Sequence, residues 1–113
     1  MKHVIRPCAR DDIIRQFRWY LIEQNASAAA FRFLDAVDES VGELLRTPEM
    51  GAPKAVRNPA LAGLRTWPVK GFEDIRIYYL VQRKILKVVR ILHGKRDIMP
   101  ILENEPPEDD AVH

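Results

Sequence analysis

Two stretches in the first half of the chain carry hydrophobic residues at helical spacing. In the first stretch one helix face is apolar, through Ile13, Ile14, Phe17, Tyr20 and Leu21. In the second stretch the same pattern runs further, through Ala30, Leu34, Val37, Val41, Leu44 and Leu45. The polar residues around 24–27 interrupt the pattern only briefly. We therefore expect two helices that form an antiparallel hairpin.

The ends of both predicted helices carry residues that favour helix starts and stops. Asp11 or Asp12 suits the start of the first helix, because carboxylates interact favourably with the free amides and the dipole there. Asn25 or Ser27 suits the cap of the second helix, and Pro48 follows its expected end.

Strand patterns occupy the N-terminus and the second half of the chain. Residues 3–7 form a short strand candidate that ends at a proline. Residues 64–69, 75–82 and 85–93 form three more, rich in Val, Ile and Tyr, and residues 83–84 join the last two. The order β-α-α-β-β-β predicts an α+β fold in which the helical hairpin packs on one face of a mainly antiparallel sheet, with the other face partly open.

The connecting segments complete this picture. Residues 47–63 are rich in proline and glycine and read as a long loop, and 96–102 have room for one or two helical turns. The periodicities predict the following core: Ile13, Phe17, Leu21, Leu34, Val37, Val41, Leu44, Ile77, Tyr79, Val89 and Ile91.

Charge is distributed unevenly along the 113 residues, although the formal net charge is only +2. Residues 52–102 carry 11 basic and 3 acidic side chains, whereas 103–113 carry 5 acidic and no basic ones. We expect a single domain over 1–102 and an acidic tail over 103–113 that is dispensable for the fold. The basic block indicates an acidic partner, either nucleic acid or a protein segment, or else solvated charge on exposed strands.

The composition excludes several classes of protein. Cys8 is the only cysteine, and the three histidines are scattered, so we expect neither a disulfide nor a metal site. No glycine-rich phosphate loop or nucleophile elbow occurs, so no cofactor is expected. The chain has no run of apolar residues long enough for a membrane span and no signal peptide, which favours the cytoplasm.

One dense polar cluster, residues 93–97, follows the last predicted strand. A turn at 83–84 places Arg76 opposite Ile91 and close to His93, so that Arg76, His93, Lys95 and Arg96 converge at one end of the sheet. Such a group is suited to holding phosphates or carboxylates. The alternative is structural, with Asp97 pairing with Arg76 or Arg96 to fasten the C-terminal segment.

Two sequence strings then point to a family. The run from Gly71 to Tyr79 (GFEDIRIYY) and the run from His93 to Ile98 (HGKRDI) together resemble ParE toxins of the RelE/ParE superfamily, over about residues 2–102. The resemblance implies the toxin half of a bacterial type II toxin–antitoxin pair that arrests growth. It also implies a heteromeric complex with a cognate ribbon-helix-helix, ParD-like antitoxin.

Two mechanisms occur in this superfamily. RelE-like members cut messenger RNA on the ribosome, using basic residues and usually a C-terminal tyrosine, whereas ParE-like members inhibit DNA gyrase. Arg76 and Arg96 match the two arginines of the RelE type, but Leu102 stands at the tyrosine position. Cleavage needs one group to activate the 2′-hydroxyl and another to protonate the leaving oxygen, and only His93 is in view. This departure from the RelE pattern favours the ParE interpretation, a non-enzymatic inhibitor of gyrase.

The alternative is a ribosome-dependent endoribonuclease whose catalytic residues are Arg76, His93 and Arg96. A third possibility, a small nucleic-acid-binding module, lacks the aromatic stacking pattern. We expect DNA to be contacted only indirectly, through the antitoxin or gyrase.

The resemblance and the charge pattern together give two sets of binding residues. The residues expected to contact the target are Arg65, Trp67, Arg76, His93, Lys95 and Arg96. Those expected to contact the antitoxin, on the sheet and along a groove over 11–46, are Phe17, Leu21, Phe31, Leu34, Arg76 and Arg90.

Overall fold

The structure is a computed structural model, and it describes residues 1–107. Its elements follow the predicted order with three short additions, the π-helical turn η1, strand β2 and the 3₁₀ turn η2. They are β1 (Lys2–Ile5), α1 (Pro7–Arg18), η1 (Trp19–Glu23), α2 (Ser27–Arg46), β2 (Ala52–Pro53), η2 (Pro59–Leu61), β3 (Arg65–Val69), β4 (Phe72–Gln82), β5 (Ile85–His93) and α3 (Met99–Glu103).

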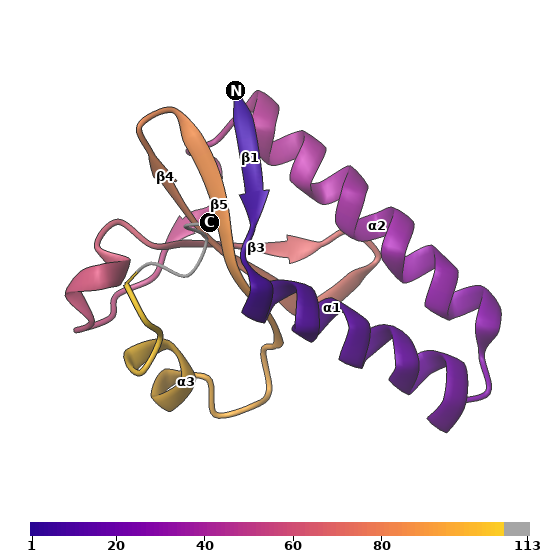
Figure 1. Cartoon of the computed structure of the whole chain (residues 1–113). Helices are drawn as coiled ribbons and strands as arrows, with labels where there is room; N and C mark the ends of the chain where they lie inside the picture. Colours follow the sequence, from indigo (N-terminus) through magenta and orange to yellow (C-terminus); the bar gives the residue numbers. More distant parts are fainter. Residues whose placement is uncertain (108–113) are drawn as a thin grey trace.

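The five strands form one sheet in the order β1-β5-β4-β3-β2. β1 runs parallel to β5, and the remaining neighbours are antiparallel. α1 and α2 lie side by side over one face of this sheet (Figure 1). The predicted α+β architecture is therefore confirmed.

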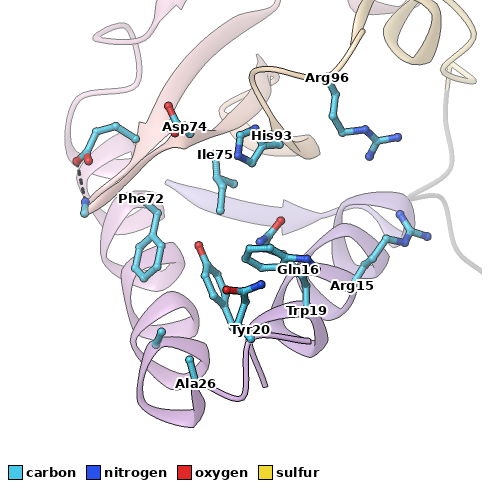
Figure 2. Close-up of a pocket in the computed structure, with 14 residues that line it drawn as sticks. Arg15, Gln16, Trp19, Tyr20, Ala26, Phe72, Asp74, Ile75, His93 and Arg96 are labelled. Carbon is cyan, nitrogen blue, oxygen red and sulfur yellow. Dashed lines mark hydrogen bonds between the residues drawn. The ribbon is translucent and has the colours of Figure 1, made fainter. Parts of the chain in front are cut away.

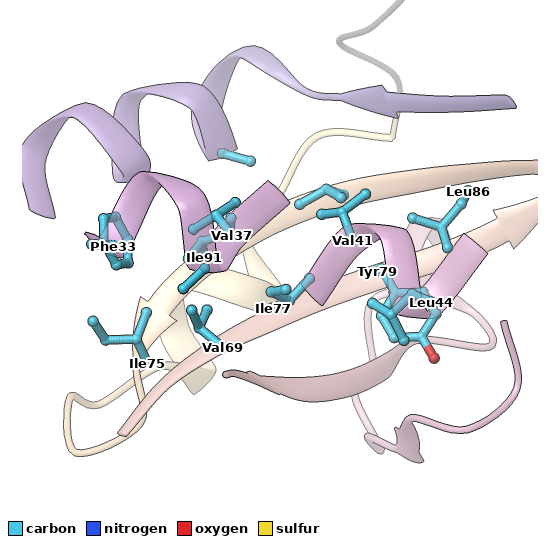
Figure 3. Packing of buried hydrophobic residues seen from close by; sticks show 13 residues of the cluster. Phe33, Val37, Val41, Leu44, Val69, Ile75, Ile77, Tyr79, Leu86 and Ile91 are labelled. Carbon is cyan, nitrogen blue, oxygen red and sulfur yellow. The ribbon is translucent and has the colours of Figure 1, made fainter. Parts of the chain in front are cut away.

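The main core lies between α2 and the sheet. Every third or fourth residue of α2 is buried, and these side chains meet the inward face of β4 and β5 (Figure 3). Of the predicted core, the buried residues are Val37, Val41, Leu44, Ile77, Tyr79, Val89 and Ile91. The half-buried ones are Ile13, Phe17, Leu21 and Leu34. Three of these four lie on α1 and η1, whose fully buried positions are only Ala9 and Asp12.

A second hydrophobic cluster covers the other face of the sheet, which the sequence analysis leaves partly open. It joins strand residues to the 47–64 segment and to α3, through Leu61, Leu64, Tyr78, Leu80, Val89, Leu92, Ile98 and Leu102. The predicted loop thus packs as a cover, because Leu61 and Leu64 each expose 2 % or less of their surface.

The β4–β5 hairpin differs from its predicted register by one residue over half its length. Arg83 and Lys84 both have positive φ angles, 55° and 63°, which is the conformation of a type I′ turn. Beyond this turn the register shifts between Tyr78 and Tyr79, so Arg76 pairs with Leu92 and not with Ile91. The irregularity is a β-bulge, which the strand pattern does not reveal.

The two predicted helix starts are also wrong. α1 begins at Pro7, a residue whose fixed φ and missing N–H suit the first helical position. Asp12 therefore lies in the middle of the helix, where it is 5 % exposed. The N-cap of α2 is Ala26, without a side-chain cap bond, and Asn25 instead reverses the chain at a φ of 48°.

The C-terminal segment packs against the domain beyond residue 102. The Glu103 carboxylate accepts the backbone N–H groups of Arg57 (2.9 Å) and Asn58 (2.8 Å). Glu105 is buried and accepts a hydrogen bond from Arg90 at 3.2 Å. Glu103 and Glu105 therefore pack against the domain, residues 108–113 lie outside the described residues, and the dispensability of 103–113 stays a prediction.

Candidate functional site

An open pocket of about 870 Å³ lies where the helical hairpin ends beside the sheet. Its walls come from the end of α1 and η1 on one side, and from the start of β4 and the end of β5 on the other (Figure 2). The residues around it are Arg15, Gln16, Trp19, Tyr20, Gln24, Ala26, Ala29, Gly71, Phe72, Glu73, Asp74, Ile75, His93 and Arg96.

Aromatic rings form the apolar part of this pocket. Tyr20 lies edge-on to both Trp19 and Phe72, with ring centroids 5.1 and 5.5 Å apart, and Phe72 in turn contacts the core residue Phe33 at 5.6 Å. Burial raises the pKa of the Tyr20 phenol above its ordinary value. Because the rings are anchored in the core, the pocket offers a fixed apolar surface to a partner.

Charges of both signs surround the aromatic rings. Arg15 and Arg96 line the pocket together with Glu73 and Asp74. The Lys95 ammonium lies 3.7 Å from a carboxylate oxygen of Asp74, and both side chains are exposed. The predicted cationic cluster is therefore largely offset by acidic neighbours at this end of the sheet.

His93 is held at the mouth of the pocket by its own loop. Its Nδ1 atom accepts the backbone N–H of Lys95 at 3.3 Å, and the N–H of Gly94 donates to the carbonyl of Asp74 at 2.6 Å. A neutral His93 in this arrangement carries its proton on Nε2. The loop therefore fixes both the position and the tautomer of the imidazole.

Arg76 does not join this site. It pairs with Leu92, whereas His93 pairs with Ile75, so Arg76 and His93 project from opposite faces of the sheet. The Arg76 Nε donates to Thr66 Oγ1 at 3.0 Å. All four predicted residues lie at this end of the sheet, but only His93 and Arg96 line the pocket, and the Arg76 side chain lies beside Gly94 on the other face.

The other two residues predicted to contact the target lie on β3, away from the pocket. Arg65 Nη1 donates to the carbonyls of Glu49 (3.0 Å) and Gly51 (2.7 Å), which ties the start of β3 to the preceding loop. Trp67 is half-buried and packs against the main core.

The residues predicted to contact the antitoxin fall into two groups. Phe17 and Phe31 meet edge-on across the hairpin, 5.2 Å between centroids, and 57 % of Phe31 is exposed. Leu21 and Leu34 are half-buried. Arg90, by contrast, is bound to Asp12 and Glu105, and the hydrogen bonds that it donates to Asp12 are the main reason that its pKa is raised. The hairpin residues are thus available at the surface, whereas Arg90 is engaged inside the domain.

The sequence analysis misses several residues of the pocket, notably Arg15, Trp19 and Phe72. Trp19 is 45 % exposed because the helix widens into a π-helical turn there. The adjacent aromatics Trp19 and Tyr20, placed where the helical pattern stops, were the available signal.

The described residues show neither a metal-binding cluster nor a membrane-spanning helix. Residues 1–107 contain no group of three or more His, Cys, Asp and Glu placed to hold a metal ion. None of the helices in the same range has the length and apolar character that a membrane span requires.

A helical hairpin over a mainly antiparallel sheet, with an aromatic pocket at its end, defines a small α+β protein. Residues 4–98 match the family described as the ParE toxin of the type II toxin-antitoxin system, parDE. Because the match spans most of the chain, the protein belongs to the ParE toxin family.

The fold agrees with this assignment. The chain resembles a solved structure described as the chromosomal ParDE toxin–antitoxin system from P. aeruginosa, with a TM-score of 0.64 and 18 % identity. The alignment covers 82 % of this chain and 95 % of that one. A comparison with curated proteins gave no match.

Proposed function

We propose that this ParE-family toxin inhibits DNA gyrase and does not cleave messenger RNA. The observation that carries the proposal is the placement of Arg76 and His93 on opposite faces of the sheet. An acid and a base that act on one phosphodiester must both lie within hydrogen-bond reach of it. Two groups separated by the sheet do not meet that requirement.

The C-terminal segment supports the same proposal. Leu102, at the position where RNase-type relatives carry tyrosine, is 0 % exposed and belongs to the cluster under α3. The remaining cations at the sheet end, Lys95 and Arg96, bind anions but are poor proton donors at neutral pH. Neither of these two cations gives His93 a partner for general acid–base catalysis.

We infer that the toxin is neutralised by a ParD-like antitoxin that binds along the hairpin and in the aromatic pocket. The exposed Phe31 and Trp19 and the rings of Tyr20 and Phe72 offer apolar anchors. Arg15 and Arg96 beside them suit carboxylates of an acidic amphipathic segment. We therefore also propose that the toxin acts in the cytoplasm.

Two assays on one preparation of the full chain test the proposed target. The first measures gyrase supercoiling and trapped cleavage complexes, and the second measures messenger RNA cleavage on translating ribosomes. We expect inhibition in the first and no cleavage in the second. Ribosome-dependent cleavage that is lost in His93→Gln, with supercoiling untouched, contradicts the proposal and supports the endoribonuclease.

A further inference from the structure

Cationic groups gather at the end of the sheet opposite the aromatic pocket. β4 is 11 residues long and runs from the pocket at Phe72 to the β4–β5 turn. Figure 1 shows that this turn, the N-terminus and the C-terminal end of α2 lie at the same end of the molecule. The positive groups there, called the cationic end below, are the α-amino group of Met1 and the side chains of Lys2, Arg46, Arg65, Arg83 and Lys84.

Contacts between the elements establish that these groups are neighbours. Lys2 pairs with Ile85, the first residue after the turn. Met1, Arg46 and Arg65 line a second pocket of about 530 Å³ together with Val81, which precedes the turn. One side of the β4–β5 turn is thus surrounded by β1, the end of α2 and the start of β3.

The charge at this end is not offset. Among the residues that the structure describes, Lys2, Arg46, Arg83 and Lys84 form no ion pair, and Arg65 donates to backbone carbonyls. Glu49 is the one acidic residue that lines the second pocket in the described part of the chain. At the other end, Lys70 is paired with Glu39 and Lys95 with Asp74. Four cations without an ion pair and the α-amino group of Met1 thus lie at the cationic end, where a single acidic side chain of the described residues lines the pocket.

We propose that the cationic end binds the phosphate backbone of duplex DNA directly. A two-stranded ribbon closed by a tight turn has the width that enters a groove of B-DNA, where it places side chains between the phosphate strands. The tip residues Val81, Gln82, Arg83 and Lys84 are all exposed.

The composition of the tip favours a duplex over other acidic partners. No aromatic ring lies at positions 81–85, whereas proteins that bind single strands stack bases on such rings. An acidic amphipathic peptide needs an apolar groove, and the exposed apolar side chains beside the second pocket are Met1 and Val81 alone in the described range. Arginine and lysine at such a tip contact phosphates and not base edges. We therefore expect binding that does not depend on the DNA sequence.

This inference goes beyond the proposed function, because binding to bare DNA does not require gyrase. It also revises the expectation that DNA is contacted only indirectly. Under both proposals together, the β4–β5 turn contacts DNA that gyrase holds, while α1 and α2 remain available to the antitoxin.

The test removes the charge while keeping the turn. Arg83→Asn combined with Lys84→Gly replaces two cations by the residue pair most favoured in a type I′ turn, so the hairpin is preserved. Binding of the full chain to a labelled duplex of mixed sequence is followed by fluorescence anisotropy across a salt series. The double variant should bind more weakly, with a slope of log K against log salt shallower by about 1.8, since each phosphate contact contributes about 0.9.

Arg10→Gln combined with Arg32→Gln is the matched control, because it removes two exposed cations from α1 and α2, away from the β4–β5 turn. This control should bind duplex as the wild type does, and Arg46→Gln should weaken binding without touching the turn. If Arg83→Asn with Lys84→Gly leaves the affinity for duplex and the salt slope unchanged, the proposal is overturned. A larger loss of affinity in the control than in this double variant overturns it as well. Binding of a polyglutamate peptide with no binding of duplex overturns it too, in favour of an acidic protein partner.

Discussion

Asp12 of α1 and Arg90 of β5 form a bidentate ion pair in the interior of the domain. Arg90 Nε donates to Asp12 Oδ2 at 2.7 Å and Nη2 donates to Oδ1 at 2.9 Å. Asp12 Oδ2 also accepts the backbone N–H of Ile91 at 3.0 Å, and only 2 % of the Asp12 side chain is exposed. One carboxylate thus fastens the first helix to the last strand.

Replacement of Asp12 by Asn should destabilise the domain strongly. The variant leaves the Arg90 guanidinium without its main counter-charge, and breaking a buried pair from one side costs about 3–5 kcal/mol. Urea unfolding of the full chain measures the loss. Asp11→Asn is the control, since Asp11 is exposed on the same turn and should change the free energy of unfolding by less than about 0.5 kcal/mol. Equal losses in the two variants contradict a specific role for the pair.

Glu103 and Glu105 extend the packed structure past α3, and a truncation tests their contribution. Ending the chain after Leu102 removes the acceptor for the N–H groups of Arg57 and Asn58 and the second carboxylate on Arg90. We expect a loss of about 3 kcal/mol, because Arg90 loses one of its two carboxylate partners and the half-buried N–H of Asn58 loses its acceptor. A chain that ends after Pro107 keeps every described contact and is the reference. Equal stability of the two truncated chains contradicts the prediction.

Two glycines should respond to alanine in opposite directions. A Cβ atom on Gly51 would lie only 2.7 Å from Cε1 of Tyr79, whose hydroxyl accepts the N–H of Gly51 and donates to the carbonyl of Pro48. Gly51→Ala should therefore cost about 1–3 kcal/mol. Gly42 lies inside α2, where an added Cβ meets only Arg46 Nη1 at 3.9 Å. Gly42→Ala should stabilise by up to about 1 kcal/mol, and thermal unfolding distinguishes the two.

All three tyrosines should ionise late in the folded protein. Desolvation by burial raises the pKa of Tyr20, Tyr78 and Tyr79 above 10.0. Each neutral phenol contributes its full share of stability below pH 10, the pKa of tyrosine in the unfolded chain. This contribution is lost as the pH rises through the higher pKa of the folded protein. Tyrosinate absorbance should therefore appear at higher pH in the native chain than in guanidinium chloride. Coinciding titration curves contradict the prediction.

The sequence predicts elements well where a period is long. α2 and β4 each carry an uninterrupted pattern, 3.6 or 2 residues per repeat, and both were located within a few residues. The family strings around Arg76 and His93 likewise identify the ParE family.

Features that depend on tertiary contacts were not predicted. The bulge at Tyr78 and Tyr79 moves Arg76 by one position, and a strand pattern contains no signal for such an inserted residue. Asp12 looks like a helix start in sequence because its partner, Arg90, is distant along the chain. The basic block spans 52–102, but only the fold brings the cations of its β4–β5 turn next to Lys2 and Arg46 from the first half of the chain.

Phe31 provides the sharpest test of the antitoxin surface. The side chain is 57 % exposed and touches Phe17, so Phe31→Ser should leave the free energy of unfolding nearly unchanged. An exposed aromatic anchor at an interface often contributes about 2 kcal/mol, so affinity for a cognate ParD-like antitoxin should fall roughly 30-fold. Isothermal titration calorimetry on the full toxin measures this change. Val81→Ser removes an apolar group that is 40 % exposed at the opposite end of the sheet and should bind as the wild type does. An equal loss in both variants, or none in Phe31→Ser, means that the antitoxin does not use the helical hairpin.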